Sequence, residues 1–149
     1  MNLQIKIKLS DENGYYGTPF RRWINENLSG YIGNYCNSTD ARILDLGCGE
    51  GQYIKFIKDV SKGTYTGVDI NMHNNWPKIS EDKNNGALAL KYARYDAHDI
   101  ATIGETYNFI YSITAFEHFE DDKKVITQIK TILEKDGYFL MIVPSKYSY

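Results

Sequence analysis

The stretch that decides the fold is residues 43–51, with the sequence ILDLGCGEG. It predicts an apolar strand that ends in an acid, Asp45, and is followed by three glycines at alternate positions, Gly47, Gly49 and Gly51. Glycine has no Cβ, so its backbone can adopt positive φ and let a ligand approach closely. A helix that follows such a loop points unpaired N–H groups at the ligand. The sequence therefore predicts a loop that binds a nucleoside through its main chain.

A second apolar stretch, residues 65–69, also ends in an acid, Asp69, eighteen residues after Gly51. In a parallel sheet, an acid at the tip of the neighbouring strand is placed to meet a ribose diol. Together the two strand tips predict one nucleoside pocket.

The remaining chain alternates between strand and helix patterns, which predicts right-handed βαβ units and a doubly wound α/β fold with a mostly parallel sheet. We expect helices at residues 52–60, 79–83 and 121–135, a turn at residues 136–137, and strands within residues 88–95 and at residues 138–143.

The N-terminal part, residues 1–38, is expected to form a cap segment ahead of a core at residues 39–149. Residues 3–9 alternate apolar and polar side chains, which predicts an extra strand. Thr18 and Pro19 can begin a helix that Gly30 or Gly33 would end. Its apolar face is expected to contain Phe20, Trp23 and Ile24 with Tyr31 or Leu28.

Several segments, in order, resemble the class I S-adenosylmethionine-dependent methyltransferases. They are residues 43–51, the strand tips at 65–69 and 95–97, residues 107–112 with 116–119, and residues 133–144. The matches cover about residues 40 to 145, and their order and spacing make the signal strong. The resemblance implies a sheet order of 3-2-1-4-5. Family members normally add a helix and two further strands, which this sequence lacks after Val143.

The resemblance also implies the residues that hold the cofactor, S-adenosylmethionine. They are Asp45, Gly47, Cys48, Gly49, Gly51, Asp69, Ile70, Asp96, Ala97, Ser112, Ile113 and Thr114. Asp45 would order the loop and the cofactor's amino group, directly or through water, and Asp69 would accept both ribose hydroxyls. Asp96 would accept from the adenine amine, with Ile70 and Ala97 beside the base. Cys48 occupies a place that requires a small residue, so we expect packing rather than nucleophilic chemistry.

Some residues have two interpretations. Asp96 is either the adenine ligand or a helix N-cap that serves residues 99 and 100. His118 either takes a proton from the methyl acceptor or is structural. Arg21 and Arg22 either neutralise the methionyl carboxylate or form a solvated helix face.

Composition excludes several classes of function. The 149 residues carry a formal net charge of −2 with scattered basic residues, which argues against nucleic acid as a partner. No apolar run reaches the roughly 20 residues that cross a bilayer, so we expect a cytoplasmic protein without membrane contact. Two cysteines, Cys36 and Cys48, and three histidines show no metal-ligand spacing, which predicts reduced thiols and no metal.

The predicted last strand would be a bare hydrophobic edge. Three explanations compete: the chain is a fragment of a longer protein, two copies form a homodimer through this edge, or residues 3–9 cover it.

The favoured function is methyl transfer to a small-molecule O or N acceptor. Residues 112–115 lack the Asn/Asp-Pro-Pro-aromatic tetrad associated with amino-methylation of adenine or glutamine. The alternatives are a non-catalytic cofactor-binding or interaction domain and, less favoured, an NAD-dependent oxidoreductase. The oxidoreductase fingerprint requires glycine at position 52, where this chain has Gln52.

Overall fold

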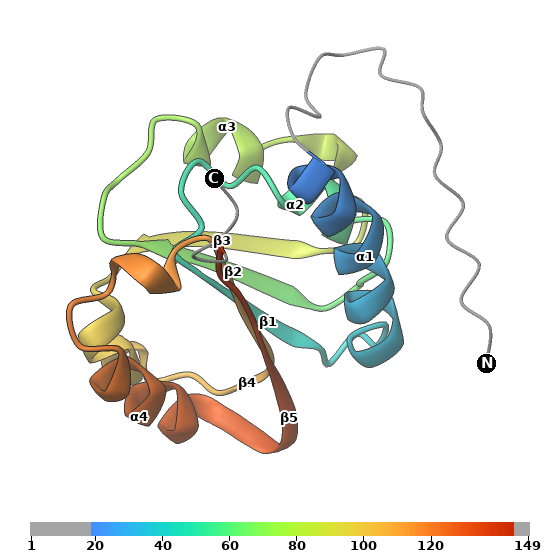
Figure 1. Cartoon of the computed structure of the whole chain (residues 1–149). Helices are drawn as coiled ribbons and strands as arrows, with labels where there is room; N and C mark the ends of the chain where they lie inside the picture. Colours follow the sequence, from blue (N-terminus) through green and yellow to red (C-terminus); the bar gives the residue numbers. More distant parts are fainter. Residues whose placement is uncertain (1–18, 145–149) are drawn as a thin grey trace.

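The structure is a computed structural model that describes residues 19–144. Its centre is an all-parallel, five-stranded sheet with the order β3-β2-β1-β4-β5 (Figure 1). The strands are β1 (Arg42–Leu46), β2 (Thr64–Asp69), β3 (Ala89–Arg94), β4 (Tyr107–Ile113) and β5 (Leu133–Ile142). This confirms the predicted doubly wound α/β fold and its strand order. The strand predicted at residues 3–9 and the side chains of Arg21 and Arg22 lie outside the described residues.

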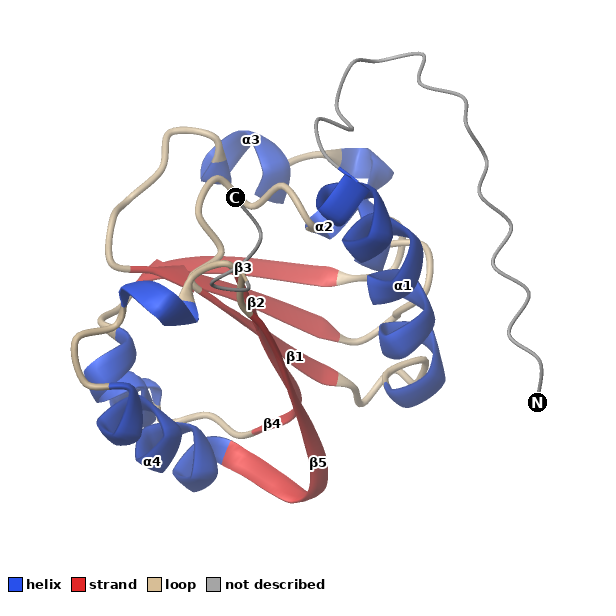
Figure 2. Ribbon diagram, viewed as in Figure 1, coloured by secondary structure: helices blue, strands red, loops and turns tan. Residues whose placement is uncertain are grey.

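Helices cover both faces of the sheet (Figure 2). One face carries α1 (Pro19–Tyr35), α2 (Ile54–Ile57) and α3 (Trp76–Ser80), and the other carries the 3-10 segment η2 (Ala97–Ile103) and α4 (Asp122–Ile132). Successive residues of β1 are therefore buried in opposite directions. Ile43 packs in the core under α1 and α2, and Leu44 packs in the core under η2 and α4. A central strand buried on both faces reads as a continuous apolar run.

Helix α1 is longer than predicted, because it continues through Gly30 and Gly33 to Tyr35. Its buried residues, Ile24, Leu28 and Ile32, recur at helical spacing and hold it against the sheet. Glycine costs a helix interior about 1 kcal/mol relative to alanine, and burial of three large side chains exceeds that cost.

The apolar face of α1 differs in part from the prediction. Ile24 and Leu28 are buried as expected. Trp23 and Tyr31 are 43% and 40% exposed, so the expected burial of Trp23 is wrong and the choice between Leu28 and Tyr31 falls on Leu28.

Helix α4 ends at Ile132, earlier than predicted, and β5 begins at the next residue, Leu133. The turn predicted at residues 136–137 lies inside β5. There the pairing with β4 shifts, since Tyr107 is opposite Leu133 but Phe109 is opposite Tyr138. Asp136 adopts a left-handed φ of 64° within this irregularity. Residues 134–137 therefore form a bulge within β5, whereas the sequence predicted a turn between the helix and the strand.

The shorter helices also differ from the prediction. Helix α2 occupies only the centre of residues 52–60, and α3 begins at Trp76, ahead of the predicted range 79–83. Pro77 lies in the first turn of α3, where its missing N–H is tolerated. No helix in the described part of the chain is long and apolar enough to cross a bilayer.

Strand β5 is an edge of the described sheet, next to β4 alone. Tyr138, Met141 and Val143 are 41–48% exposed on or just after this strand. The expected hydrophobic edge is thus present among the described residues, and the three explanations for what covers it stay predictions.

Candidate functional site

The glycine loop after β1 has the backbone that the sequence predicts. Gly47, Gly49 and Gly51 have φ values of 80°, 53° and 78°. The N–H groups of Gly47 and Cys48 both donate to the carbonyl of Val68, each at 2.9 Å. The loop is therefore fastened to the end of β2, and glycine is needed because side chains rarely adopt these angles.

The acid at the tip of β2 also holds this loop. Asp69 Oδ2 accepts from the Gly49 N–H at 3.0 Å, and Oδ1 accepts from the Asn71 N–H at 2.9 Å. Trp76, which is 5% exposed, donates its Nε1–H to the Gly49 carbonyl at 2.8 Å and stacks on Tyr92. Both main-chain groups of Gly49 thus have a partner. Nothing in the sequence pattern indicated this role of Trp76.

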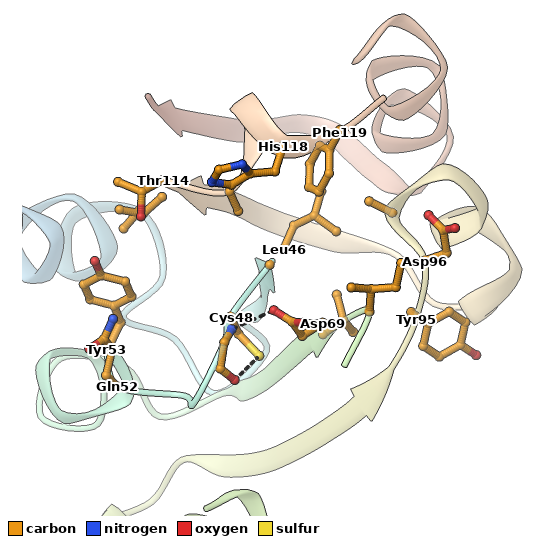
Figure 3. A pocket seen from close by; sticks show the side chains of 17 residues that line it. Leu46, Cys48, Gln52, Tyr53, Asp69, Tyr95, Asp96, Thr114, His118 and Phe119 are labelled. Carbon is orange, nitrogen blue, oxygen red and sulfur yellow. Dashed lines mark hydrogen bonds between the residues drawn. The ribbon is translucent and has the colours of Figure 1, made fainter. Parts of the chain in front are cut away.

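A cavity of about 360 Å³ opens at the carboxyl ends of the strands (Figure 3). Its lining includes most of the predicted site residues, namely Gly47, Cys48, Gly49, Asp69, Ile70, Asp96, Ala97, Ile113, Thr114 and His118. Sequence reasoning missed other lining residues, among them Gln52, Tyr53, Tyr95 and Phe119. Clefts at this place in an open parallel sheet are the usual ligand sites, and the volume suits a small molecule.

Asp45, Gly51 and Ser112 do not line the cavity. A Cβ on Gly51 would lie 2.6 Å from the Tyr92 hydroxyl oxygen, so the glycine there makes room for a packed side chain. Ser112 is fully buried, and its hydroxyl has no hydrogen-bond partner within the described structure. These positions support the cavity from behind rather than forming its wall.

Asp45 is 1% exposed and lies beneath the glycine loop. Its Oδ2 accepts from the hydroxyls of Tyr65 at 2.7 Å and Tyr111 at 2.9 Å. Burial raises the pKa of Asp45 to about 7, although the two hydroxyl donors oppose that rise. The carboxyl group thus faces two tyrosines inside the core, and its expected ordering of the cofactor's amino group, directly or through water, stays a prediction.

Cys48 is 3% exposed on the cavity floor. Burial, followed by the nearby Asp45 and Asp69 carboxylates, raises the pKa of its thiol far above the usual value. A protonated thiol is a poor nucleophile. The structure thus supports the packing interpretation of Cys48.

At the other end of the cavity, Asp96 is the N-cap of η2. Its Oδ1 accepts from the backbone N–H of His98 at 2.9 Å and lies 2.7 Å from His98 Nδ1. These two contacts lower the pKa of Asp96 below its usual value. Asp96 is therefore a helix N-cap as one interpretation expected, although it serves His98 rather than residues 99 and 100, and its adenine role stays a prediction for a side chain that lines the cavity.

Thr114 follows β4 with a left-handed φ of 53°, which is uncommon for a branched residue. Its N–H donates to the Ile142 carbonyl at 2.8 Å, which fastens the segment to β5. His118 ends the 3-10 turn η3 (Phe116–His118) and is exposed. In Figure 3 Thr114 lies at the opposite end of the cavity from Asp96, with His118 between them on the rim.

The cavity is suited to a ligand that donates hydrogen bonds. It contains two carboxyl groups, Asp69 and Asp96, and no lysine or arginine is among the described residues that line it. A ribose diol, an amine and a sulfonium cation all match this lining.

Comparison with known proteins agrees with the geometry. A methyltransferase domain family matches residues 17–149. Coclaurine N-methyltransferase bound to N-methylheliamine and SAH is 25% identical, with a TM-score of 0.62 over 83% of this chain and 37% of that one. The [4+2]-cyclase SpnF is 14% identical, with a TM-score of 0.65 over 87% and 48% of the two chains. The CurJ carbon methyltransferase is 17% identical, with a TM-score of 0.64 over 85% and 35%.

No curated protein is significantly similar to this chain in sequence. The chain spans between 35 and 48% of the length of the three solved structures. Because the family match covers most of the sequence, the chain belongs to the methyltransferase domain family and has the class I fold of S-adenosylmethionine-dependent methyltransferases.

Proposed function

We propose that this chain binds S-adenosylmethionine in the cavity at the strand ends and transfers its methyl group to a small-molecule O or N acceptor. The observation that carries the proposal is the pairing of a positive-φ glycine loop with two carboxyl groups, Asp69 and Asp96, in one cavity with no lysine or arginine in its described lining. The carboxylates are hydrogen-bond acceptors with negative charge, so they fit a cationic nucleoside whose hydroxyl and amino groups are donors.

Each end of the cavity has a proposed role. Asp69 would bind the ribose hydroxyls, and Asp96 with the Ala97 N–H would bind the adenine edge. Ile70 is 56% exposed beside the cavity and would be covered by the base. The loop at Gly47 and Gly49 would pass beside the methionyl part. Asp45 would act from within the core, where its carboxyl group accepts from Tyr65 and Tyr111.

The cofactor supplies a methyl group already activated on a sulfonium, so the protein chiefly supplies alignment, worth on the order of 7 to 11 kcal/mol when geometry is good. His118 on the exposed rim is the proposed base for an acceptor that arrives protonated. Thr114 and Ile113 lie at the same cavity, where acceptor and methyl group would meet.

The solved structures of this fold are named for different reactions. Coclaurine N-methyltransferase was solved with N-methylheliamine, a small molecule, and its name describes methylation on nitrogen. CurJ is named a carbon methyltransferase and SpnF a cyclase, so this fold alone does not determine the reaction. The absence of the Asn/Asp-Pro-Pro-aromatic tetrad at residues 112–115 disfavours adenine and glutamine amino groups as acceptors, and we propose a small-molecule O or N acceptor in their place.

Calorimetric titration with S-adenosylmethionine, S-adenosylhomocysteine and NADH tests the cofactor. We expect heat of binding with the first two and none with NADH; the reverse pattern would refute the proposal. Transfer of a radiolabelled methyl group to a panel of small alcohols, phenols and amines tests catalysis. Tight binding without transfer to any acceptor would favour a non-catalytic cofactor-binding domain. His118→Gln should lower kcat and leave S-adenosylhomocysteine affinity unchanged.

A further inference from the structure

His98 connects two segments that form the same end of the cavity. Its Nδ1 lies 2.7 Å from Asp96 Oδ1, just after β3, and its Nε2 accepts from the Asp121 N–H at 3.2 Å, just before α4. Its ring also packs edge-on against Phe119, which lines the cavity with Asp96. One imidazole thus joins both walls of the proposed adenine site.

The hydrogen-bond partners determine which ring nitrogen carries the proton. A backbone N–H is only a donor, so the Nε2 atom that faces Asp121 must be an unprotonated acceptor. A neutral imidazole has one acceptor and one donor nitrogen. The proton therefore lies on Nδ1, which donates to Asp96 Oδ1.

This arrangement orients the Asp96 carboxylate. Oδ1 receives two donors from His98, the backbone N–H and Nδ1–H. In the described structure Oδ2 receives no protein hydrogen bond, and the side chain is 47% exposed at the cavity. Oδ2 is left as an acceptor for a ligand amine, and the two donors on Oδ1 restrict rotation about the carboxyl group.

We propose that His98 is a positioning residue for base selectivity, in that its Nδ1–H orients Asp96 to accept from a 6-amino purine and to reject a 6-oxo purine. The inference rests on the proposed function, because it assumes that the base lies at Asp96. A 6-oxo purine would place a carbonyl oxygen against the carboxylate, with no donor between them.

Paired substitutions separate the two hydrogen bonds of His98. In His98→Asn the amide nitrogen takes roughly the place of Nδ1 and keeps a donor to Asp96. In His98→Gln the amide oxygen takes roughly the place of Nε2 and keeps only the acceptor for Asp121. His73→Asn is the matched control, since His73 Nε2 lies 3.6 Å from the other cavity acid, Asp69.

The measurement is the ratio of dissociation constants for S-inosylhomocysteine, the hypoxanthine analogue, and S-adenosylhomocysteine. We expect wild type to prefer the adenine ligand by roughly tenfold or more, because a site built to accept a hydrogen bond discriminates strongly. His98→Asn and His73→Asn should keep the ratio within about threefold of wild type, and His98→Gln should lower it about tenfold, as expected for a charge-assisted bond.

If His98→Gln weakens both ligands equally, or keeps the wild-type ratio, the inference is wrong while the proposed function stands. If wild type binds neither ligand, the proposed function itself fails. Nitrogen-15 NMR of histidine-labelled wild type at pH 8.5 gives a test that does not depend on the folding of a variant. The His98 signals should show protonated Nδ1 and unprotonated Nε2, and the opposite tautomer would overturn the inference.

Discussion

Asp45 and Asp69 look equivalent in the sequence, because each follows an apolar run at the end of adjacent strands, yet the structure gives them opposite environments. Asp45 is buried with two tyrosine hydroxyls, and Asp69 lines the cavity. The strand register explains the difference. Asp45 is opposite Gly67, so Asp69 lies two residues further toward the cavity edge. At about 3.3 Å per residue this places Asp45 roughly 7 Å deeper.

The distance of an acid from the cavity edge thus determines what the acid at a strand end can contact. A buried acid is satisfied by core groups and is sensitive to its own charge, whereas an acid at the edge can hold the loop and is available to a ligand.

The largest effect is expected for Asp45→Asn at high pH. Burial raises the pKa of Asp45 from 3.8 to about 7, so the unfolded chain loses the proton first as pH rises. Wild-type stability should therefore fall between about pH 4 and 7 and level off above that. Three pKa units correspond to about 4 kcal/mol, the upper limit by which the Asn variant should exceed wild type at pH 8.

Urea unfolding of both proteins at pH 4 and pH 8 measures this difference. The two free energies of unfolding should converge at pH 4, where the carboxyl group is protonated in the folded state. A variant that is less stable than wild type by the same amount at both pH values would show that the buried charge is not the cause.

Asp69→Asn should act on ligand binding instead. Loss of the carboxylate removes charge-assisted hydrogen bonds worth about 1.5–3 kcal/mol, so affinity for S-adenosylhomocysteine should fall roughly 10- to 100-fold. Its free energy of unfolding should fall by only about 1 kcal/mol, because the asparagine oxygen can keep one of the two loop N–H bonds that the carboxylate accepts. Calorimetry measures the affinity of this variant and of Asp45→Asn for S-adenosylhomocysteine. An equal loss of affinity in both variants would show that the two acids do not have separate roles.

Tyr65→Phe and Tyr111→Phe should each lower stability by about 1 kcal/mol, because each removes one hydroxyl donor to Asp45. Since these donors lower the pKa of Asp45, the fall in stability should also move to higher pH. Tyr31→Phe is the control, because Tyr31 is 40% exposed. Thermal and urea unfolding across pH 5 to 9 would show no shift if the hydroxyls were unimportant.

The smallest effect is expected for Trp76→Phe, which removes the donor to the Gly49 carbonyl. Affinity for S-adenosylhomocysteine should fall about threefold to fivefold, consistent with a single neutral hydrogen bond of about 1 kcal/mol. Trp23→Phe should leave affinity unchanged, since Trp23 is 43% exposed on α1. That control also leaves Trp76 as the sole tryptophan, so its fluorescence should report binding; an unresponsive signal would argue against contact between Trp76 and the loop.

Sequence patterns predicted the elements that depend on local chemistry. The three glycines have positive φ as expected, and Asp69, Asp96 and Thr114 meet at one cavity because the parallel strands end at the same edge. Element ends were less predictable. Helix α1 passes through Gly30 and Gly33 because its packing against the sheet outweighs their intrinsic cost.

Two features of the site had no sequence signal. Trp76 holds Gly49 from α3, and His98 joins the ends of β3 and α4, in each case across a distance in sequence that no local pattern spans. A contact of this kind depends on how the helices pack against the sheet, and that packing is a property of the whole core.

The sequence alone specifies the succession of strands and helices, the glycine loop and the acids at the strand ends, because backbone freedom and apolar periodicity are local properties. Which of these acids a ligand can reach, Asp69 and not Asp45, depends on the tertiary structure. That choice depends on the register between β1 and β2 and on the two tyrosines that enclose Asp45, and both arise from packing between segments distant in the chain.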